Sequence, residues 1–186
     1  MKTTKKGFTL IELLVVIAIL AVLATAVVVI LNPAQLIKQG RDSTRISDLA
    51  ALHSAIALYL SDVATADLGT CATNARCTAA GTSPMVNPSC TTVTSTAVTG
   101  SGWVDINFGQ ISSGSPLSKL PLDPVNDTTN FYAYFCDDTA KTFEINANME
   151  SAKYSTGGSG NVESNEKDGG DNDNWYEIGN DPGLDL

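Results

Sequence analysis

The sequence has few of the residues that catalysis usually requires. Its 186 residues include a single histidine, His53, and no metal-binding or phosphate-binding motif surrounds it. No serine or cysteine stands in a pattern that pairs it with a base, and no glycine-rich loop could cradle a phosphate. We therefore expect the protein not to be an enzyme, and we interpret His53 as a residue on the face of a helix.

Basic residues are scarce as well. The chain has 11 lysines and arginines against 20 aspartates and glutamates, which gives a formal net charge of −9 at pH 7. Binding to nucleic acid by bulk electrostatics needs clustered lysine and arginine side chains. The acidic balance therefore argues against nucleic acid as a partner.

Cysteine pairs of the CxxC type are absent, and no histidine stands near a cysteine. The cysteines therefore lack the spacing of a zinc site, and we expect no metal centre from them. Four cysteines outside the apolar segment are typical of an exported domain with two disulfides. Three pairings are open. We favour one short bridge within residues 63–102 and one from there to the last cysteine; the candidates are Cys71, Cys77, Cys90 and Cys136.

One long apolar stretch, residues 8–31, dominates the chain. Of its 24 residues only Thr9, Glu12 and Thr25 are not apolar. As a helix it would reach roughly 36 Å, which is enough to cross a bilayer with some tilt. A carboxylate near the start of a membrane helix costs on the order of 2–3 kcal/mol unless something compensates it. Glu12 is therefore the residue of this stretch that needs an explanation.

Two interpretations of this segment compete. The lysines of the first six residues and an apolar run with no Ala-x-Ala site after it would suit an uncleaved signal anchor of a simple membrane receptor. The string Gly-Phe-Thr-Leu-Ile-Glu at residues 7–12, however, resembles the class III signal of the type IV pilin superfamily. That superfamily includes type IV pilins and the pseudopilins of type II secretion and competence systems.

The resemblance implies a processing step and an assembly step. A prepilin peptidase would cut between Gly7 and Phe8 on the cytoplasmic side, and the new amino group of Phe8 would be methylated. Glu12 would then face the Phe8 ammonium of a neighbouring subunit, because a buried carboxylate is tolerable when a fixed cation neutralises it. The implied partners are further copies of this chain, the peptidase, an assembly ATPase and a platform protein.

The resemblance also implies a function and a location. The precursor would sit in the cytoplasmic membrane with its head outside. As a structural subunit of the major-pilin kind, it would polymerise through its N-terminal helix into a type IV pilus at the cell surface. A major pseudopilin of a type II secretion or competence pseudopilus is the alternative, and a minor tip subunit that binds a surface or DNA is the third.

We expect an α+β fold of the pilin type, in which a long N-terminal helix packs on a small antiparallel β-sheet. The predicted parts are a leader (1–7), a membrane-spanning and filament-core helix (8–31), its amphipathic continuation (32–62) and an exported β-rich head (63–186). The head would contain a cysteine-stapled loop and an acidic C-terminal loop. Asn32-Pro33 predicts a kink near residues 29–33.

The amphipathic part of the helix is predicted from its apolar residues, which recur three and four positions apart. The stripe that should face the sheet consists of Ile46, Leu49, Leu52, Ile56, Tyr59 and Leu60. The polar residues between them, interpreted as the other side of the helix, are Arg41, Asp42, Arg45, Asp48 and Asp62.

Several segments predict strands. Residues 103–108 alternate with period two, residues 131–136 and 142–148 read as a hairpin, and shorter strands are expected within 91–99 and 175–179. The turn-rich connector at 120–127, followed by a hairpin that ends in Asn-Met-Glu, resembles the C-terminal half of major pseudopilins.

The acidic loop from Asp168 to Asp173 invites a calcium interpretation, because calcium prefers oxygen ligands from a flexible loop. Major pseudopilins carry a calcium site in this region, so the resemblance supports the idea. The spacing of an EF-hand fails, since Trp175 stands where the third oxygen ligand belongs. We expect no cofactor and interpret the loop as solvated, with calcium as the alternative.

Overall fold

The computed structural model describes residues 7–71, 75–79, 90–181 and 183. Six of the seven predicted leader residues, among them Lys2, Lys5 and Lys6, lie outside the described residues. The chain folds as two units, Met1–Ile37 and Lys38–Leu186, which we describe separately.

The first unit is built around α1 (Leu10–Leu31), a helix of 22 residues. It contains no glycine or proline, so nothing interrupts its hydrogen bonds. It ends at Asn32, whose φ of 41° lies in the left-handed region that closes many helices. Pro33 then begins α2 (Pro33–Asp62), where its missing N–H is harmless because the first N–H groups of a helix have no intrahelical partner. The break lies within the range that Asn32-Pro33 predicted.

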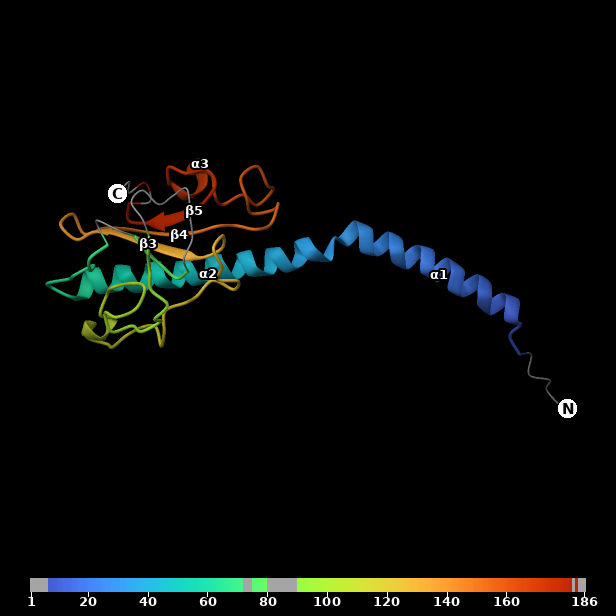
Figure 1. The fold of residues 1–186 in the computed structure, drawn as a ribbon, viewed down its shortest axis with the longest axis horizontal. Coiled ribbons are helices and arrows are strands. Elements are labelled where there is room, and N and C mark those ends of the chain that lie inside the picture. Colours follow the sequence, from blue (N-terminus) through green and yellow to red (C-terminus); the bar gives the residue numbers. More distant parts are fainter. Residues whose placement is uncertain (1–6, 72–74, 80–89, 182, 184–186) are drawn as a thin grey trace. The chain divides into compact units, whose positions relative to one another are not determined.

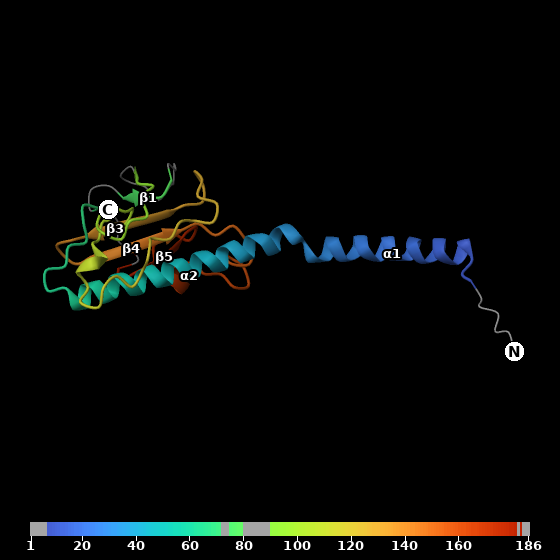
Figure 2. The ribbon, with the colours of Figure 1, turned by 90° about the horizontal axis from the view of Figure 1, so that it is seen from below.

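From Lys38 onward α2 belongs to the second unit and lies along one face of the sheet (Figures 1 and 2). Its buried residues recur three and four positions apart, as predicted for a helix that covers a sheet. Ile46 and Leu60 of the predicted stripe are half-buried. The others are fully buried: Leu49, Leu52, Ile56 and Tyr59.

The sheet has five strands in the order β2-β1-β3-β4-β5. Neighbouring strands are antiparallel, except that β1 and β2 run parallel. A long helix on a small, mostly antiparallel sheet confirms the predicted α+β, pilin-like layout. The strands are β1 (Arg76–Cys77), β2 (Thr91–Thr92), β3 (Tyr132–Asp137), β4 (Thr142–Ala147) and β5 (Tyr176–Gly179).

β3 and β4 form the predicted hairpin. Asp137 Oδ1 accepts hydrogen bonds from the N–H groups of Thr139 (2.7 Å) and Ala140 (3.1 Å), and Lys141 adopts a φ of 60°. A short acidic side chain that bonds its own backbone two residues on is a common way to close a turn. The chain therefore reverses direction within a few residues.

Alternation along the hairpin creates two cores. On the side of α2, Tyr132, Tyr134 and Phe143 pack with the apolar stripe of the helix. On the opposite face, Phe135 belongs to a smaller cluster with Trp175. The sheet is thus covered by side chains on both faces.

The prediction of a strand at residues 103–108 was wrong. Trp103 and Val104 are both fully buried, so the side chains do not alternate between a core and solvent. The segment is held by separate backbone bonds to residues 95 and 98, and by the Trp103 indole N–H, which donates to the Pro121 carbonyl at 2.9 Å. It ends in the short 3-10 helix η1 (Phe108–Gln110). Its apolar side chains enter the α2 core without a strand ladder.

The strand expected within residues 91–99 is also much shorter than predicted. Only Thr91–Thr92 forms a strand, and Thr99 adds one isolated bridge to Asn107. Val93 still donates its N–H to the Cys77 carbonyl of β1, and beyond Val93 the backbone bonds are shared among residues 103, 108 and 120 rather than directed to one partner strand.

Two disulfides connect segments within the head. Cys71 pairs with Cys136, which ties the segment after α2 to β3, and Cys77 pairs with Cys90, next to the parallel strands β1 and β2. This is one of the three pairings that the sequence left open, with one short bridge and one to Cys136.

Candidate functional site

The N-terminal end of α1 is closed by a reciprocal capping box. Thr9 is the N-cap, and its hydroxyl oxygen accepts a hydrogen bond from the N–H of Glu12 at 3.3 Å. In return, Glu12 Oε2 accepts from the N–H and the hydroxyl of Thr9, both at 2.7 Å. Such a box satisfies backbone N–H groups that the start of a helix otherwise leaves without partners.

The capping box gives Glu12 a local role beside the one predicted for assembly. Both bonds from Thr9 end on Oε2, so within the described part of the chain Oε1 has no hydrogen-bond partner. A local and an intermolecular contact could therefore use different oxygens of one carboxylate. Thr9 was not predicted as a capping residue, although a Thr-x-x-Glu pattern before an apolar run is the known signature of this cap.

The predicted cleavage point, Gly7-Phe8, lies in irregular backbone just before α1. The Phe8 side chain is 89% exposed, and open space surrounds the position where a Cβ on Gly7 would lie. Exposed backbone outside regular structure is where proteolysis concentrates. Thr9 and Glu12 both follow this bond, so a cut there would leave the capping box in the processed chain.

The surface of α1 is apolar and uncovered. None of its residues is buried, and its leucines, isoleucines and valines are exposed along its whole length. Among the described residues, one helix is long and apolar enough to cross a membrane, near the N-terminus within Leu10–Asp62. An apolar surface of this extent marks a contact with lipid or with other protein.

A family model matches this N-terminus: the prokaryotic N-terminal methylation motif, over residues 2–28. This chain carries a prepilin-type signal. The motif is the class III signal of type IV pilins and pseudopilins, so it supports a precursor that is pilin- or pseudopilin-like. The family of this motif consists of structural pilin-like proteins rather than enzymes. No curated protein and no solved structure matches the chain.

The prepilin-type signal also bears on partners and location in general terms. Together with the apolar helix it fits insertion into a membrane, processing by a prepilin peptidase and later assembly into a surface filament. The match spans the cleavage point, Glu12 and most of α1.

In the head, the structure buries two charged residues that we interpreted as part of the polar side of the helix, and that prediction was wrong. Asp42 and Arg45 are completely inaccessible to solvent. Positions 42, 45, 49, 52, 56 and 59 are three and four residues apart, so both side chains continue the stripe that faces the sheet. The spacing of Asp42 and Arg45 indicated that they face the sheet, but their charged side chains indicated an exposed position.

Arg45 lies at the centre of a buried ion network. Its Nε and Nη2 donate to Asp123 at 2.5 and 2.9 Å, its Nη1 donates to Asp42 at 2.7 Å, and its Nη2 lies 2.7 Å from a Glu150 carboxylate oxygen. Asp42 also accepts from the N–H groups of Glu150 (3.0 Å) and Ser151 (2.8 Å). Charges can be buried when their partners are this complete. The network ties α2 to two segments that are distant in sequence.

The charged forms of Arg45 and Glu150 are stabilised by their partners in this network. Burial alone would lower the pKa of Arg45, but its hydrogen bonds to Asp123, Glu150 and Asp42 raise the pKa above its ordinary value. Arg41 Nε donates to Glu150 at 2.7 Å, and the hydrogen bonds from Arg41 lower the pKa of the Glu150 carboxyl. With every charge matched by a partner, the network supports the head rather than offering a site for chemistry.

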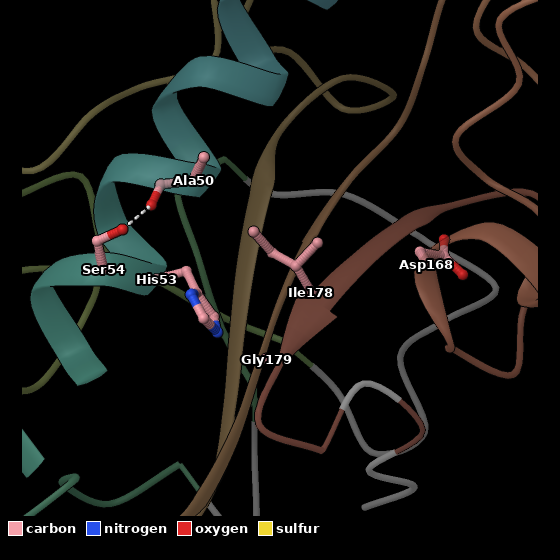
Figure 3. A pocket seen from close by; sticks show the side chains of 6 residues that line it. All are labelled: Ala50, His53, Ser54, Asp168, Ile178 and Gly179. Atoms are coloured by element: carbon pink, nitrogen blue, oxygen red, sulfur yellow. Dashed lines mark hydrogen bonds between the residues drawn. The ribbon is translucent and has the colours of Figure 1, made fainter.

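A hollow of about 340 Å³ lies between α2 and β5 (Figure 3). His53 is half-buried there on the helix, and its ring lies 5.5 Å from that of Phe143. Figure 3 places Ile178 between His53 and Asp168, so the histidine and the acid do not face each other directly. The hollow is lined by Ala50, His53, Ser54, Asp168, Ile178 and Gly179.

The acidic loop after α3 (Asn165–Asp168) directs its carboxylates to its own backbone. Asp168 accepts from the N–H groups of Gly170 (3.1 Å) and Glu177 (3.2 Å), and Asp173 Oδ1 accepts from the N–H of Asn165 at 3.0 Å. No group of three or more His, Cys, Asp or Glu residues in the described ranges could hold a metal ion. Calcium binding by this loop stays a prediction that chelation can test.

Proposed function

We propose that this protein is the major structural subunit of a type IV pilus and that it polymerises through its N-terminal helix. The observation that carries the proposal is α1, a capped apolar helix of 22 residues, none of which the chain itself buries. Burial of apolar surface is worth roughly 25 cal/mol per Å², so such a helix is stable only when lipid or protein covers it. A bilayer would cover it in the precursor, and other copies of α1 would cover it in a filament.

Cleavage between Gly7 and Phe8 would supply the charge that assembly needs. Hydrolysis of this amide leaves a carboxylate on Gly7 and an amino group on Phe8, which is protonated at neutral pH. Glu12 would keep Thr9 on Oε2 and accept from the Phe8 ammonium of an adjacent copy with Oε1. A carboxylate without a partner in a membrane helix costs on the order of 2–3 kcal/mol. Pairing would therefore favour the polymer over the single subunit in the bilayer.

The position of the subunit is proposed from the same residue. The resemblance implies that minor tip pseudopilins of one class often lack this glutamate, so the presence of Glu12 supports a place along the shaft. An assembly ATPase and a platform protein would drive extraction from the membrane, as the resemblance implies. The negative head would then remain on the outside of the filament.

A second candidate function is a major pseudopilin of a secretion or competence system. It is supported by the connector and hairpin of residues 120–148, which resemble major pseudopilins. Both functions use the same helix and the same Glu12. They differ in phenotype: deletion of a pilin removes surface filaments, whereas deletion of a pseudopilin abolishes secretion or DNA uptake.

The test is electron microscopy of filaments sheared from cells, with mass spectrometry of the subunit N-terminus. We expect filaments built from chains that begin with N-methylated Phe8. Glu12→Val should leave a processed, inserted subunit but reduce the amount of filament by at least about tenfold, because the buried ammonium loses its partner. Thr25→Val, which removes another polar group from α1, is the matched control and should assemble normally. Filaments whose subunits begin at Met1, or wild-type amounts from Glu12→Val, would overturn the proposal.

A further inference from the structure

The hollow between α2 and β5 combines an apolar wall with an acid at one end (Figure 3). Ala50 and Ile178 supply the wall, and Asp168 at the end of α3 supplies the acid. With a volume of about 340 Å³ the hollow is at the small end of the range for binding sites. Such walls suit a long side chain that has an apolar stem and a positively charged end.

Asp168 is an acid without a cation. It is half-buried, and its oxygens accept hydrogen bonds from the N–H groups of Gly170 (3.1 Å) and Glu177 (3.2 Å), which hold the carboxylate in place at the hollow. None of the ion pairs between described residues includes Asp168. A carboxylate that is partly removed from water and fixed in position gains from a cation that reaches it.

Lys119 is a cation without an acid. Its side chain is exposed, and it takes part in none of the ion pairs within the described part of the chain. It is also the only lysine or arginine between Arg76 and Lys141. Close to it in sequence, Leu122 and Val125 are 39% and 40% exposed. This segment therefore presents one isolated positive charge with exposed apolar side chains, which complements the hollow in both respects.

The hollow and Lys119 lie on opposite sides of α2. In Figure 1, α3 and β5 lie above α2, whereas the yellow-green segment that precedes Lys119 lies below it. The contacts agree, because β5 is one edge of the sheet and Arg76 of β1, towards the other edge, donates to the Gly102 carbonyl of this segment at 2.8 Å. Leu120, next to Lys119, donates its N–H to the carbonyl of Thr96 in the same segment. One chain therefore cannot bring Lys119 into its own hollow.

We propose that the hollow binds the Lys119 side chain of a second copy of this chain, so that the ammonium pairs with Asp168 across the interface. The contact rests on the proposed function, because it adds a contact between heads to polymerisation through α1. It joins two different surfaces and is heterologous, so the copy at each end keeps one surface free for the next. An open filament needs a contact of this kind, whereas a contact between two identical surfaces would stop at a dimer.

The first test uses the wild-type chain. Intact cells are treated with a carbodiimide, which condenses an amine and a carboxylate that touch into an amide, and the sheared filaments and the membranes are analysed by mass spectrometry. We expect a peptide that joins Lys119 to Asp168. Lys119→Arg, which keeps the charge but cannot form this amide, is the matched control and should assemble normally without the link. Wild-type material that lacks the Lys119–Asp168 link, or that has Asp168 linked to a lysine of another protein, would overturn the contact.

The second test measures the amount of filament sheared from cells. Ala50→Trp fills the hollow and should lower this amount about fivefold, whereas Ala51→Trp, at the next exposed position of α2, should leave it unchanged.

Lys119→Glu should lower the amount of filament by a similar factor of about five, because it places two acids opposite each other. Lys153→Glu changes the net charge equally at another exposed position and is the control. Wild-type amounts of filament from either Ala50→Trp or Lys119→Glu would overturn the contact.

The head contact and the proposed function fail separately. Filaments of chains that begin with N-methylated Phe8 but lack the Lys119–Asp168 link would overturn the contact and leave the proposed function intact. The link in membranes of cells that make no filaments would overturn the proposed function and leave the contact intact.

Discussion

The two consecutive helices α1 and α2 differ in how much of their surface the protein itself covers. α1 is apolar all round and has no buried residue, whereas α2 is polar on much of its surface yet buries both an apolar stripe and a set of charges. The first needs surroundings that the chain does not provide. The second is completed by the head, which supplies Asp123 and Glu150 to neutralise Arg45.

Whether a helix can hold a charged side chain in apolar surroundings depends on the partner that this side chain finds. In α1 a single carboxylate, Glu12, lies in an apolar helix and is held by Thr9 next to it. In α2 the buried Asp42 and Arg45 are held by residues far along the chain. The contacts of α1 are therefore local and await other molecules, while those of α2 are long-range and already made.

The largest expected effect comes from Arg45→Ala, which leaves Asp42 and Asp123 buried without their cation. Such a loss costs about 3–5 kcal/mol, measured as the free energy of unfolding of the head by tryptophan fluorescence. Processing at Gly7-Phe8 should continue, since α1 makes none of these contacts. Lys167→Ala, on the exposed side of α3, is the control and should change stability by less than about 0.5 kcal/mol. A head of normal stability in Arg45→Ala would contradict the conclusion that the long-range ion pairs of α2 stabilise the head.

The two disulfides also distinguish the head from α1, because both lie in the head and stabilise only that part. Replacing Cys71 and Cys136 by serine should destabilise it by about 4 kcal/mol, and replacing Cys77 and Cys90 by about 3 kcal/mol, since the first bridge spans 65 residues and the second only 13. Chemical denaturation of the two double variants measures both values. Equal losses, or a reversed order, would contradict this explanation.

A smaller effect is expected from Thr9→Val at the start of α1. It removes the hydroxyl that caps the helix, which is worth about 1 kcal/mol. Amide hydrogen exchange of Glu12 and Leu13 in micelles should become about fivefold faster, while the unfolding of the head stays unchanged. Thr9→Ser should behave as the wild type because it keeps the hydroxyl. If exchange in Thr9→Val is unaltered, the cap does not stabilise the helix.

The smallest effect is expected from removal of divalent cations. Asp168 and Asp173 accept hydrogen bonds from backbone N–H groups, so a chelator should leave the melting temperature of the head unchanged at low ionic strength. Calorimetry with and without chelator checks this. A clear fall in melting temperature would instead restore the calcium site that the acidic loop suggested.

Much of the fold could be predicted because its signals are local or periodic. The apolar run of α1, the stripe of α2 and the hairpin of residues 131–148 each show a pattern that a single element explains. The strand predicted at 103–108 failed because alternation also occurs in an irregular segment that is buried on both sides. Trp103 is held there by an indole bond to Pro121, which no local pattern indicates.

The residues of the candidate site also divide into those that a local sequence pattern predicted and those that it did not. Gly7, Phe8 and Glu12 were found from a short string, since the signal must be readable in a linear precursor. Asp42 and Arg45 were missed as buried groups, because their partners are distant in the sequence or are backbone amides. Thr9 was missed although its signature was present in the sequence.

By itself the sequence determined the prepilin-type signal, the membrane-length helix and the kind of fold, because each depends on residues that are neighbours along the chain or one helical turn apart. Only the tertiary structure decided which charges are buried and which cysteines pair. Those properties depend on desolvation and on partners brought together by folding. The residue type alone does not tell whether a charged side chain is solvated or buried.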